Sequence, residues 1–116
     1  MTTEKFEKLV DEALSNLPEE FKSKLDNVQV VVELWPSAEI AQGRLLLGLY
    51  QGIPQTTWGR GLVSAIGDKI SVYMGTIMLI SHGDEERIKE LVIDTVEHEI
   101  AHHFGISDAR LEQLKR

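Results

Sequence analysis

The chain has 116 residues, the length of one ordinary domain, which can bury about two thirds of the surface that its unfolded form exposes. It has 12 basic and 19 acidic residues and a net charge of -7, which argues against binding nucleic acid or an anionic membrane, because both attract clustered positive charge. The absence of cysteine excludes disulfides, thiolate metal sites and cysteine nucleophiles, so any metal must be held by nitrogen and oxygen.

The first part of the chain predicts two helices followed by a strand. Apolar residues recur at helical spacing over residues 4–17, and Pro18 begins a second short helix that ends near Leu25. The charged, amphipathic start "MTTEKFEKLVDEAL" lacks the features of a secretory signal, so we predict a cytoplasmic protein. The segment "VQVVVEL" (28–34) alternates as a strand with one buried face does, and Pro36 ends it.

The middle of the chain predicts two more strands separated by loops. A loop over residues 37–42 leads to "RLLLGLYQG" (44–52), whose aliphatic run and tyrosine indicate a second strand. The segment "TTWGRG" (56–61) has the composition of an exposed loop. After a Gly-Asp turn, "KISVYM" (69–74) alternates as a third strand. The predicted sheet is therefore small, with about three strands.

A long helix follows this sheet. Asp84 is a suitable N-cap before two glutamates, and the helical pattern continues to Phe104, where Gly105 ends it. This is a helix of about twenty residues, roughly 30 Å long. Ser107 can cap a last short helix. Because no repeat or linker interrupts the chain, we predict one α+β domain over residues 1–116, with a small sheet, the long helix and flanking helices.

The end of the long helix carries the segment "HEIAHHFGISD" (98–108). At about 100° per residue, His98 and His102 lie about 40° apart on one face, while the apolar residues gather on the opposite side. Two imidazoles one turn apart can bind the same zinc ion, and Glu99 between them can reach a water molecule on that ion without being a ligand. Glu99 would accept the proton of this water and later pass it to the leaving amine.

A catalytic zinc site of this kind needs a third protein ligand. Gly105 can adopt positive φ, so the chain can reverse after the helix and bring Asp108 back towards the two histidines. We therefore predict Asp108 as the third ligand. Glu97, Glu112 or a second chain could complete the shell instead, although Glu97 lies about 100° from His98 and Glu112 would need the last helix to cross the site.

Other polar residues have ordinary roles that compete with functional ones. His103 is expected to be partly buried and hydrogen-bonded rather than a ligand, and His82 is expected to be solvated in a loop. Asp94 could orient His98 from one turn before it, but a solvated helix acid is the simpler interpretation. Four residues could line a cleft or stabilise an oxyanion, although core, rim and loop positions explain them more simply: Tyr50, Trp58, Arg60 and Tyr73.

The pattern H-E-x-x-H-x-x-G-x-x-D resembles that of the small zincin-like metallopeptidases, also called minimal zincins. Its five fixed positions are matched by His98, Glu99, His102, Gly105 and Asp108. The likeness extends to "LLGLYQGIP" and "KISVYMGTIMLI", which resemble the family's strand-turn and strand-helix segments, and so covers roughly residues 45–115. The segments "TTWGRG" and "GDKISV" depart from the residues that the family usually has there. The resemblance implies a small α+β metallopeptidase-like fold that binds zinc.

These observations predict a zinc metallopeptidase that acts on peptides or proteins. We expect an open cleft bordered by the strand at 69–74, which could pair with an extended peptide. The alternative from another class is a zinc-binding regulatory or partner-binding module without turnover, and a zinc ribonuclease is opposed by the acidic charge balance. The sequence leaves the oligomeric state and the identity of the substrate open, and other divalent metals can also bind such ligands.

Overall fold

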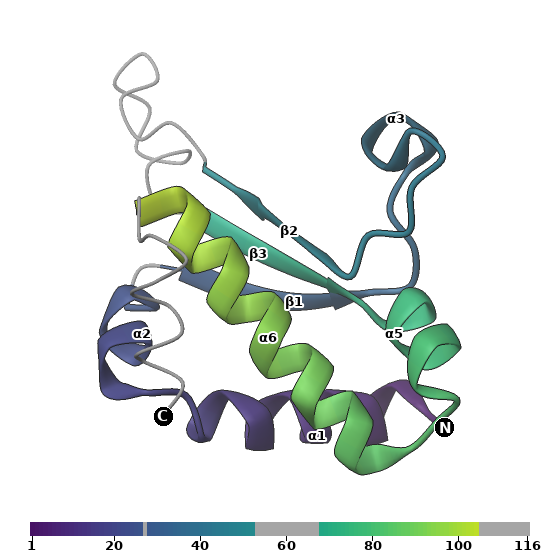
Figure 1. Ribbon diagram of the computed structural model, residues 1–116, viewed down its shortest axis with the longest axis horizontal. Coiled ribbons are helices and arrows are strands. Elements are labelled where there is room, and N and C mark those ends of the chain that lie inside the picture. The colour runs from purple at the N-terminus through teal and green to yellow at the C-terminus, as the bar shows by residue number, and fades with distance from the viewer. Residues whose placement is uncertain (27, 53–67, 105–116) are drawn as a thin grey trace.

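The computed structural model describes residues 1–26, 28–52 and 68–104. Figure 1 shows α6 crossing in front of a sheet, with α1 beneath it. The architecture is α+β, as predicted from the sequence. The described elements are, in chain order, α1 (Thr3–Ser15), α2 (Glu19–Lys24), β1 (Val28–Glu33), α3 (Ala38–Ala41), β2 (Gly48–Gln51), β3 (Asp68–Tyr73), α5 (Met74–Ser81) and α6 (Glu85–Phe104).

The sheet is mixed and has the strand order β1-β3-β2. Strand β1 runs parallel to β3, with Val28 opposite Asp68, and β2 runs antiparallel to β3, with Tyr50 opposite Ile70. Because β3 has a strand on each side, its backbone groups are used in the two ladders. The prediction that the strand at 69–74 could pair with an extended peptide is therefore wrong. Among the described strands, β2 is the one at the edge beside the end of α6.

The core lies between α6, α1 and the helix-facing side of the sheet. Helices α1 and α6 each direct an apolar stripe towards this core, and the side chains of the two stripes pack against one another. Full burial of each such aliphatic or aromatic side chain contributes about 1.5–3 kcal/mol. The innermost residues are Phe6, Ala13, Phe21, Ile70, Val72, Ile77, Ile88, Val92, Val96 and Ile100.

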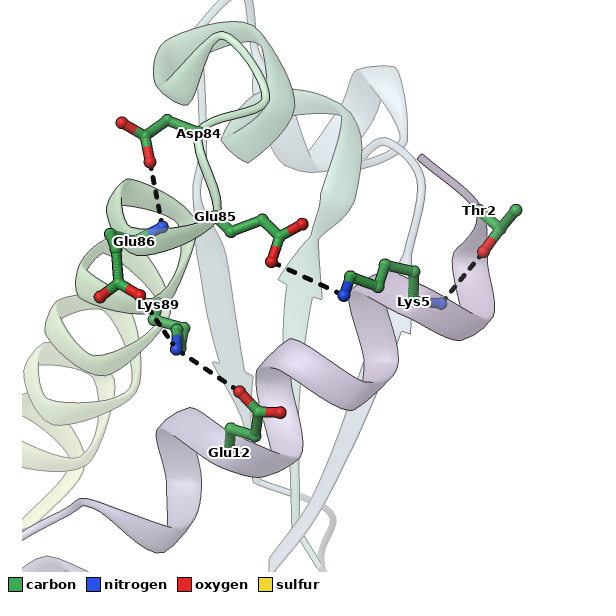
Figure 2. A network of polar contacts seen from close by, with 7 residues as sticks. All are labelled: Thr2, Lys5, Glu12, Asp84, Glu85, Glu86 and Lys89. Atoms are coloured by element: carbon green, nitrogen blue, oxygen red, sulfur yellow. Dashed lines mark hydrogen bonds and ion pairs between the residues drawn. The ribbon is translucent and has the colours of Figure 1, made fainter.

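Charged side chains join the start of α6 to α1 at the surface (Figure 2). Lys89 lies 3.5 Å from the carboxylate of Glu12, and Lys5 lies 3.6 Å from that of Glu85. Asp84 accepts a hydrogen bond at 3.0 Å from the backbone N–H two residues further on, so it caps α6 as the sequence predicted. Exposed ion pairs contribute at most about 1 kcal/mol each, so they supplement the apolar packing and do not replace it.

Two segments differ in structure from their sequence predictions. The predicted loop 37–42 contains the one-turn helix α3, in which the Ser37 hydroxyl accepts a hydrogen bond at 3.2 Å from the N–H of Ile40. The predicted strand 44–52 is shorter, because β2 covers only Gly48–Gln51. Leu47 nevertheless stays attached to the sheet, since its carbonyl accepts a hydrogen bond at 2.9 Å from the N–H of Tyr73.

Helix α5 begins directly where β3 ends, at Met74, which agrees with the strand-helix resemblance of "KISVYMGTIMLI", although periodicity did not indicate it. Its residues are apolar on nearly all sides, so they carry no contrast between faces from which a helical period could be recognised. The predicted loop at 56–61 and the predicted last helix after Ser107 lie outside the described residues. In the ranges that are described, no helix has both the length and the apolar character needed to cross a bilayer.

Candidate metal centre

Helix α6 presents the two histidines of the motif on its open side. His98 and His102 are both exposed and lie one helical turn apart, and Glu99 between them is partly buried. On the opposite side, Val96 and Ile100 are fully buried in the core. The helix thus has one packed face and one open face, as its periodicity predicted, and the imidazoles are accessible to an ion.

The tautomer of His98 is determined by a backbone contact. Its Nδ1 lies 2.8 Å from the carbonyl oxygen of Asp94, and since a carbonyl can only accept, Nδ1 must donate the proton. In the neutral ring the lone pair is then on Nε2, which is the arrangement found in metal-binding histidines. The donor set therefore fits zinc at this position. Asp94 orients His98 through its main chain, whereas the sequence had suggested its carboxylate or no contact.

The carboxylate of Glu99 is held by the neighbouring edge strand. Its Oε1 accepts a hydrogen bond at 2.7 Å from the backbone N–H of Tyr50 in β2. Because this bond engages only one of the two oxygens, Oε2 can accept a proton from another group. The contact joins residues 49 positions apart and has no signal in the sequence, since every residue except proline carries the same backbone donor.

Tyr50 is itself fastened by a small polar cluster. Its hydroxyl donates a hydrogen bond at 2.7 Å to Asp68, and its ring stacks on His103 with a centroid distance of 4.0 Å and an interplanar angle of 15°. Nε2 of His103 lies 3.7 Å from the same Asp68 oxygen. Burial raises the pKa of the Tyr50 phenol, and the hydrogen bond and charge of Asp68 raise it further. The phenol therefore keeps its proton and remains a donor.

This cluster accounts for His103. The side chain contacts Tyr50 and Asp68, as expected of a histidine with polar partners, but at 38% exposure it is more open to solvent than the partly buried position that the sequence predicted. His82 is exposed at the end of α5, as predicted. Tyr73 is buried at the end of β3, where burial and then the charge of Glu33 raise the pKa of its phenol.

Helix α6 lies very close to β2 at Gly48. A Cβ atom at this position would come within 2.5 Å of Cγ2 of Thr95 and 2.7 Å of the carbonyl oxygen of Ser71. A side chain here would thus force the helix and the strand apart. The close approach lets successive turns of α6, at Thr95, Glu99 and His103, face β2, and it brings Glu99 within hydrogen-bond reach of the strand.

A pocket of about 310 Å³ opens beside His98 and Glu99. It lies between the segment that leads into β2 and the middle of α6, and its walls are mainly apolar. The residues that line it are Leu45, Leu46, Leu47, Gly48, Leu91, Asp94, Thr95, His98 and Glu99.

The third metal ligand is the part of the predicted site that the structure does not place. Asp108 lies outside the described residues, as do Gly105 and Glu112. Glu97 directly precedes His98, but its side chain is buried (2% exposed) and lines a different pocket together with Asn16 and Pro18, away from the exposed face that carries the two histidines. Within residues 1–26, 28–52 and 68–104, no group of three or more histidines and carboxylates is arranged to hold an ion. Trp58 and Arg60 also lie outside these ranges.

The fold and the site define a class of protein: an α+β domain in which a helix exposes an H-E-x-x-H motif beside the edge strand of a mixed sheet. A family model described as zincin-like metallopeptidase matches residues 25–116, most of the chain. The chain therefore belongs to the zincin-like metallopeptidase family, which confirms the resemblance seen in the sequence. The match begins before β1, upstream of the region in which the resemblance was recognised. No curated protein matches the chain.

Proposed function

We propose that this protein is a zinc-dependent peptidase in which His98, His102 and Asp108 hold the metal and Glu99 is the general base. The observation that carries the proposal is the way in which hydrogen bonds hold His98 and Glu99. His98 directs its Nδ1 proton to a carbonyl and so keeps Nε2 for a metal, and Glu99 is held in place at one oxygen only. Family membership supports the same chemistry.

The chain's own residues would divide the work as follows. When bound, zinc supplies a Lewis acid that polarises a water molecule and the scissile carbonyl. Oε2 of Glu99 accepts the proton from this water and later gives it to the leaving amine. The N–H of Tyr50 holds Oε1, so that the carboxylate turns one defined oxygen towards the reaction. Peptides or proteins are the proposed substrates, in line with membership of a metallopeptidase family, and the cytoplasmic location stays a prediction.

Metal content is the first test. Purified protein should contain about one zinc ion per chain by elemental analysis and native mass spectrometry, and His98→Ala or His102→Ala should lose it. His82→Ala is the matched control, because His82 is an exposed histidine away from the motif, and it should keep the metal. Full zinc content in both motif variants would refute the site.

Catalysis is tested separately by Glu99→Gln. This variant should retain zinc and the fold but cleave no member of a peptide library, because Glu99 moves protons and does not hold the ion. Wild-type protein that binds zinc firmly and cleaves nothing would favour the alternative, a zinc-binding module without turnover. Undiminished cleavage by Glu99→Gln would contradict the assignment of the base.

The third ligand is tested at Asp108. If its carboxylate binds zinc, Asp108→Ala should weaken zinc affinity at least about tenfold and lower activity in parallel. Competition with a chelator of known affinity measures the change. Glu112→Ala provides the comparison, since Glu112 is the other acidic candidate that follows the motif in the sequence. Equal affinity of Asp108→Ala and wild type would move the third ligand elsewhere.

A further inference from the structure

The pocket beside His98 and Glu99 has walls that suit an apolar side chain. The segment before β2 contributes three consecutive leucines, Leu45–Leu47, and α6 contributes Leu91 from the other side. Leu45 is 64% exposed, and Leu46 and Leu47 are only partly buried. A row of leucines open to water beside a polar site is unfavourable by itself, and a ligand that covers these leucines removes apolar surface from water.

The pocket is joined to the groups that would perform the reaction. His98 and Glu99 form part of its wall. A general base acts from about 2.6–3.2 Å, so a peptide bond attacked by a water on Glu99 must lie within a few ångströms of this carboxylate. A substrate residue next to that bond has its side chain beside the pocket, since successive residues of an extended chain are about 3.3 Å apart.

The walls are also fixed in place. Leu47 accepts a backbone hydrogen bond at 2.9 Å from Tyr73 on the central strand. The absence of a side chain at Gly48 lets β2 approach Thr95 on α6, so the leucine segment is held against the helix. The same strand then holds Glu99 through Tyr50. A side chain in the pocket is thereby placed at a defined distance from the base.

We infer that this pocket binds the side chain of a substrate residue that flanks the scissile bond and selects leucine, methionine or phenylalanine. The inference rests on the proposed peptidase function. The apolar walls of the pocket offer no polar partner that would compensate for the desolvation of a charged substrate side chain. Asp94 and Glu99 are among the residues that line the pocket, so an acidic side chain there also meets like charge. Small residues such as alanine would leave the leucines partly uncovered.

Cleavage preference is the first measurement. Wild-type protein is incubated with peptides that differ only in the residue on each side of the scissile bond, and kcat/KM is determined. We expect leucine at one flanking position to be preferred over alanine or aspartate at least about tenfold, as pocket contacts of this kind allow. Equal kcat/KM values for all flanking residues, or a preference for acidic residues, would overturn the inference while leaving the peptidase function intact.

Two leucine variants locate the preference in the structure. Leu45→Asp should lower the ratio of kcat/KM for the leucine peptide to kcat/KM for the alanine peptide at least about fivefold, because only the leucine side chain uses the pocket. Leu34→Asp is the matched control, since Leu34 is 60% exposed and does not line the pocket. An equal loss in both variants, or on both peptides, would contradict a specificity pocket at this place.

A binding measurement separates the pocket from catalysis. Glu99→Gln protein, as purified, is titrated with N-acetyl-leucinamide and with N-acetyl-alaninamide while its backbone amide NMR signals are followed. We expect the leucine compound to shift the signals of Leu45–Gly48, Leu91 and Thr95 and the alanine compound to shift them much less. Binding without any peptide cleavage by wild type would sustain the pocket and refute the peptidase. Shifts that are absent, or equal for the two compounds, would refute the pocket.

Discussion

The two sides of α6 are built in different ways, although they share one helix. The side that faces α1 and the sheet is apolar, and its residues Ile88, Val92, Val96 and Ile100 are fully buried. The side that faces β2 and solvent carries the polar groups of the motif, and directed hydrogen bonds hold them. Nδ1 of His98 donates to the carbonyl of Asp94, and Glu99 accepts from the N–H of Tyr50. The first side is held by apolar packing, which has no preferred direction, and the second by hydrogen bonds, which do.

This difference implies that stability and function reside on opposite sides of the helix. Loss of one apolar group on the packed side leaves a cavity, which is costly because neighbours relax only partly. Loss of one polar group on the open side leaves a partner that water can satisfy, so the fold changes little. The arrangement of the site, however, depends on directed contacts such as those of His98 and Glu99.

The largest expected effect is therefore on the packed side. Ile100→Ala should lower the free energy of unfolding by about 2–5 kcal/mol, because the side chain of Ile100 is fully buried in the hydrophobic core. His102→Ala, two residues along the same helix but exposed, should change it by less than about 0.5 kcal/mol in metal-free protein. Urea denaturation followed by circular dichroism measures both. Similar losses in the two variants would contradict the division between the two sides.

A smaller effect is expected where the helix meets the edge strand. Gly48→Ala should cost about 1–3 kcal/mol, because its Cβ would collide with Thr95 and with the backbone of Ser71, and the resulting shift should weaken the contact between β2 and Glu99. Gly52→Ala is the control. A Cβ there meets its nearest neighbours at 3.6 and 3.7 Å, which is ordinary contact. Equal thermal stability of the two variants would show that α6 and β2 are less closely fitted.

The smallest expected effect is at the phenol of Tyr50. Tyr50→Phe keeps the backbone N–H that binds Glu99 and the ring that stacks on His103, but it removes the hydrogen bond to Asp68. We expect a loss of about 1 kcal/mol near neutral pH and unchanged metal content. A large loss of metal would mean that the phenol, and not only the backbone of residue 50, is needed at the site.

The same phenol predicts a dependence on alkaline pH. Burial, followed by the hydrogen bond and charge of Asp68, raises the pKa of Tyr50 above its usual 10.0, so the folded protein holds this proton more tightly than the unfolded chain. Above about pH 10 the unfolded chain loses the proton first, and the free energy of unfolding falls with rising pH. Tyr50→Phe should reduce this fall, and the part due to Tyr73, whose pKa is also raised, should remain. Denaturation at several pH values checks the slope.

Local patterns were sufficient for most of the secondary structure and for the helix that carries the motif. The N-cap at Asp84, the apolar stripe of α6 and the exposure of His98 and His102 all follow from neighbours within a few residues, so the sequence could indicate them. Helix α5 was indicated only by the resemblance of "KISVYMGTIMLI" to a strand-helix segment of the family, because an evenly apolar segment has no period. The aliphatic run at 45–47 was assigned to a strand because an apolar run fits a buried strand and a pocket wall equally well.

The sequence by itself determined that one helix would bear two histidines and a glutamate on one side and core residues on the other, because helical geometry repeats every 3.6 residues and needs no knowledge of the rest of the chain. Only the tertiary structure decided that β3 is central and β2 lies beside α6, that the N–H of Tyr50 holds Glu99, and that Leu45–Leu47 form a pocket at the same place. These contacts join residues far apart in the chain. They depend on which strand pairs with which, and the identity of a side chain does not reveal where its backbone N–H will point.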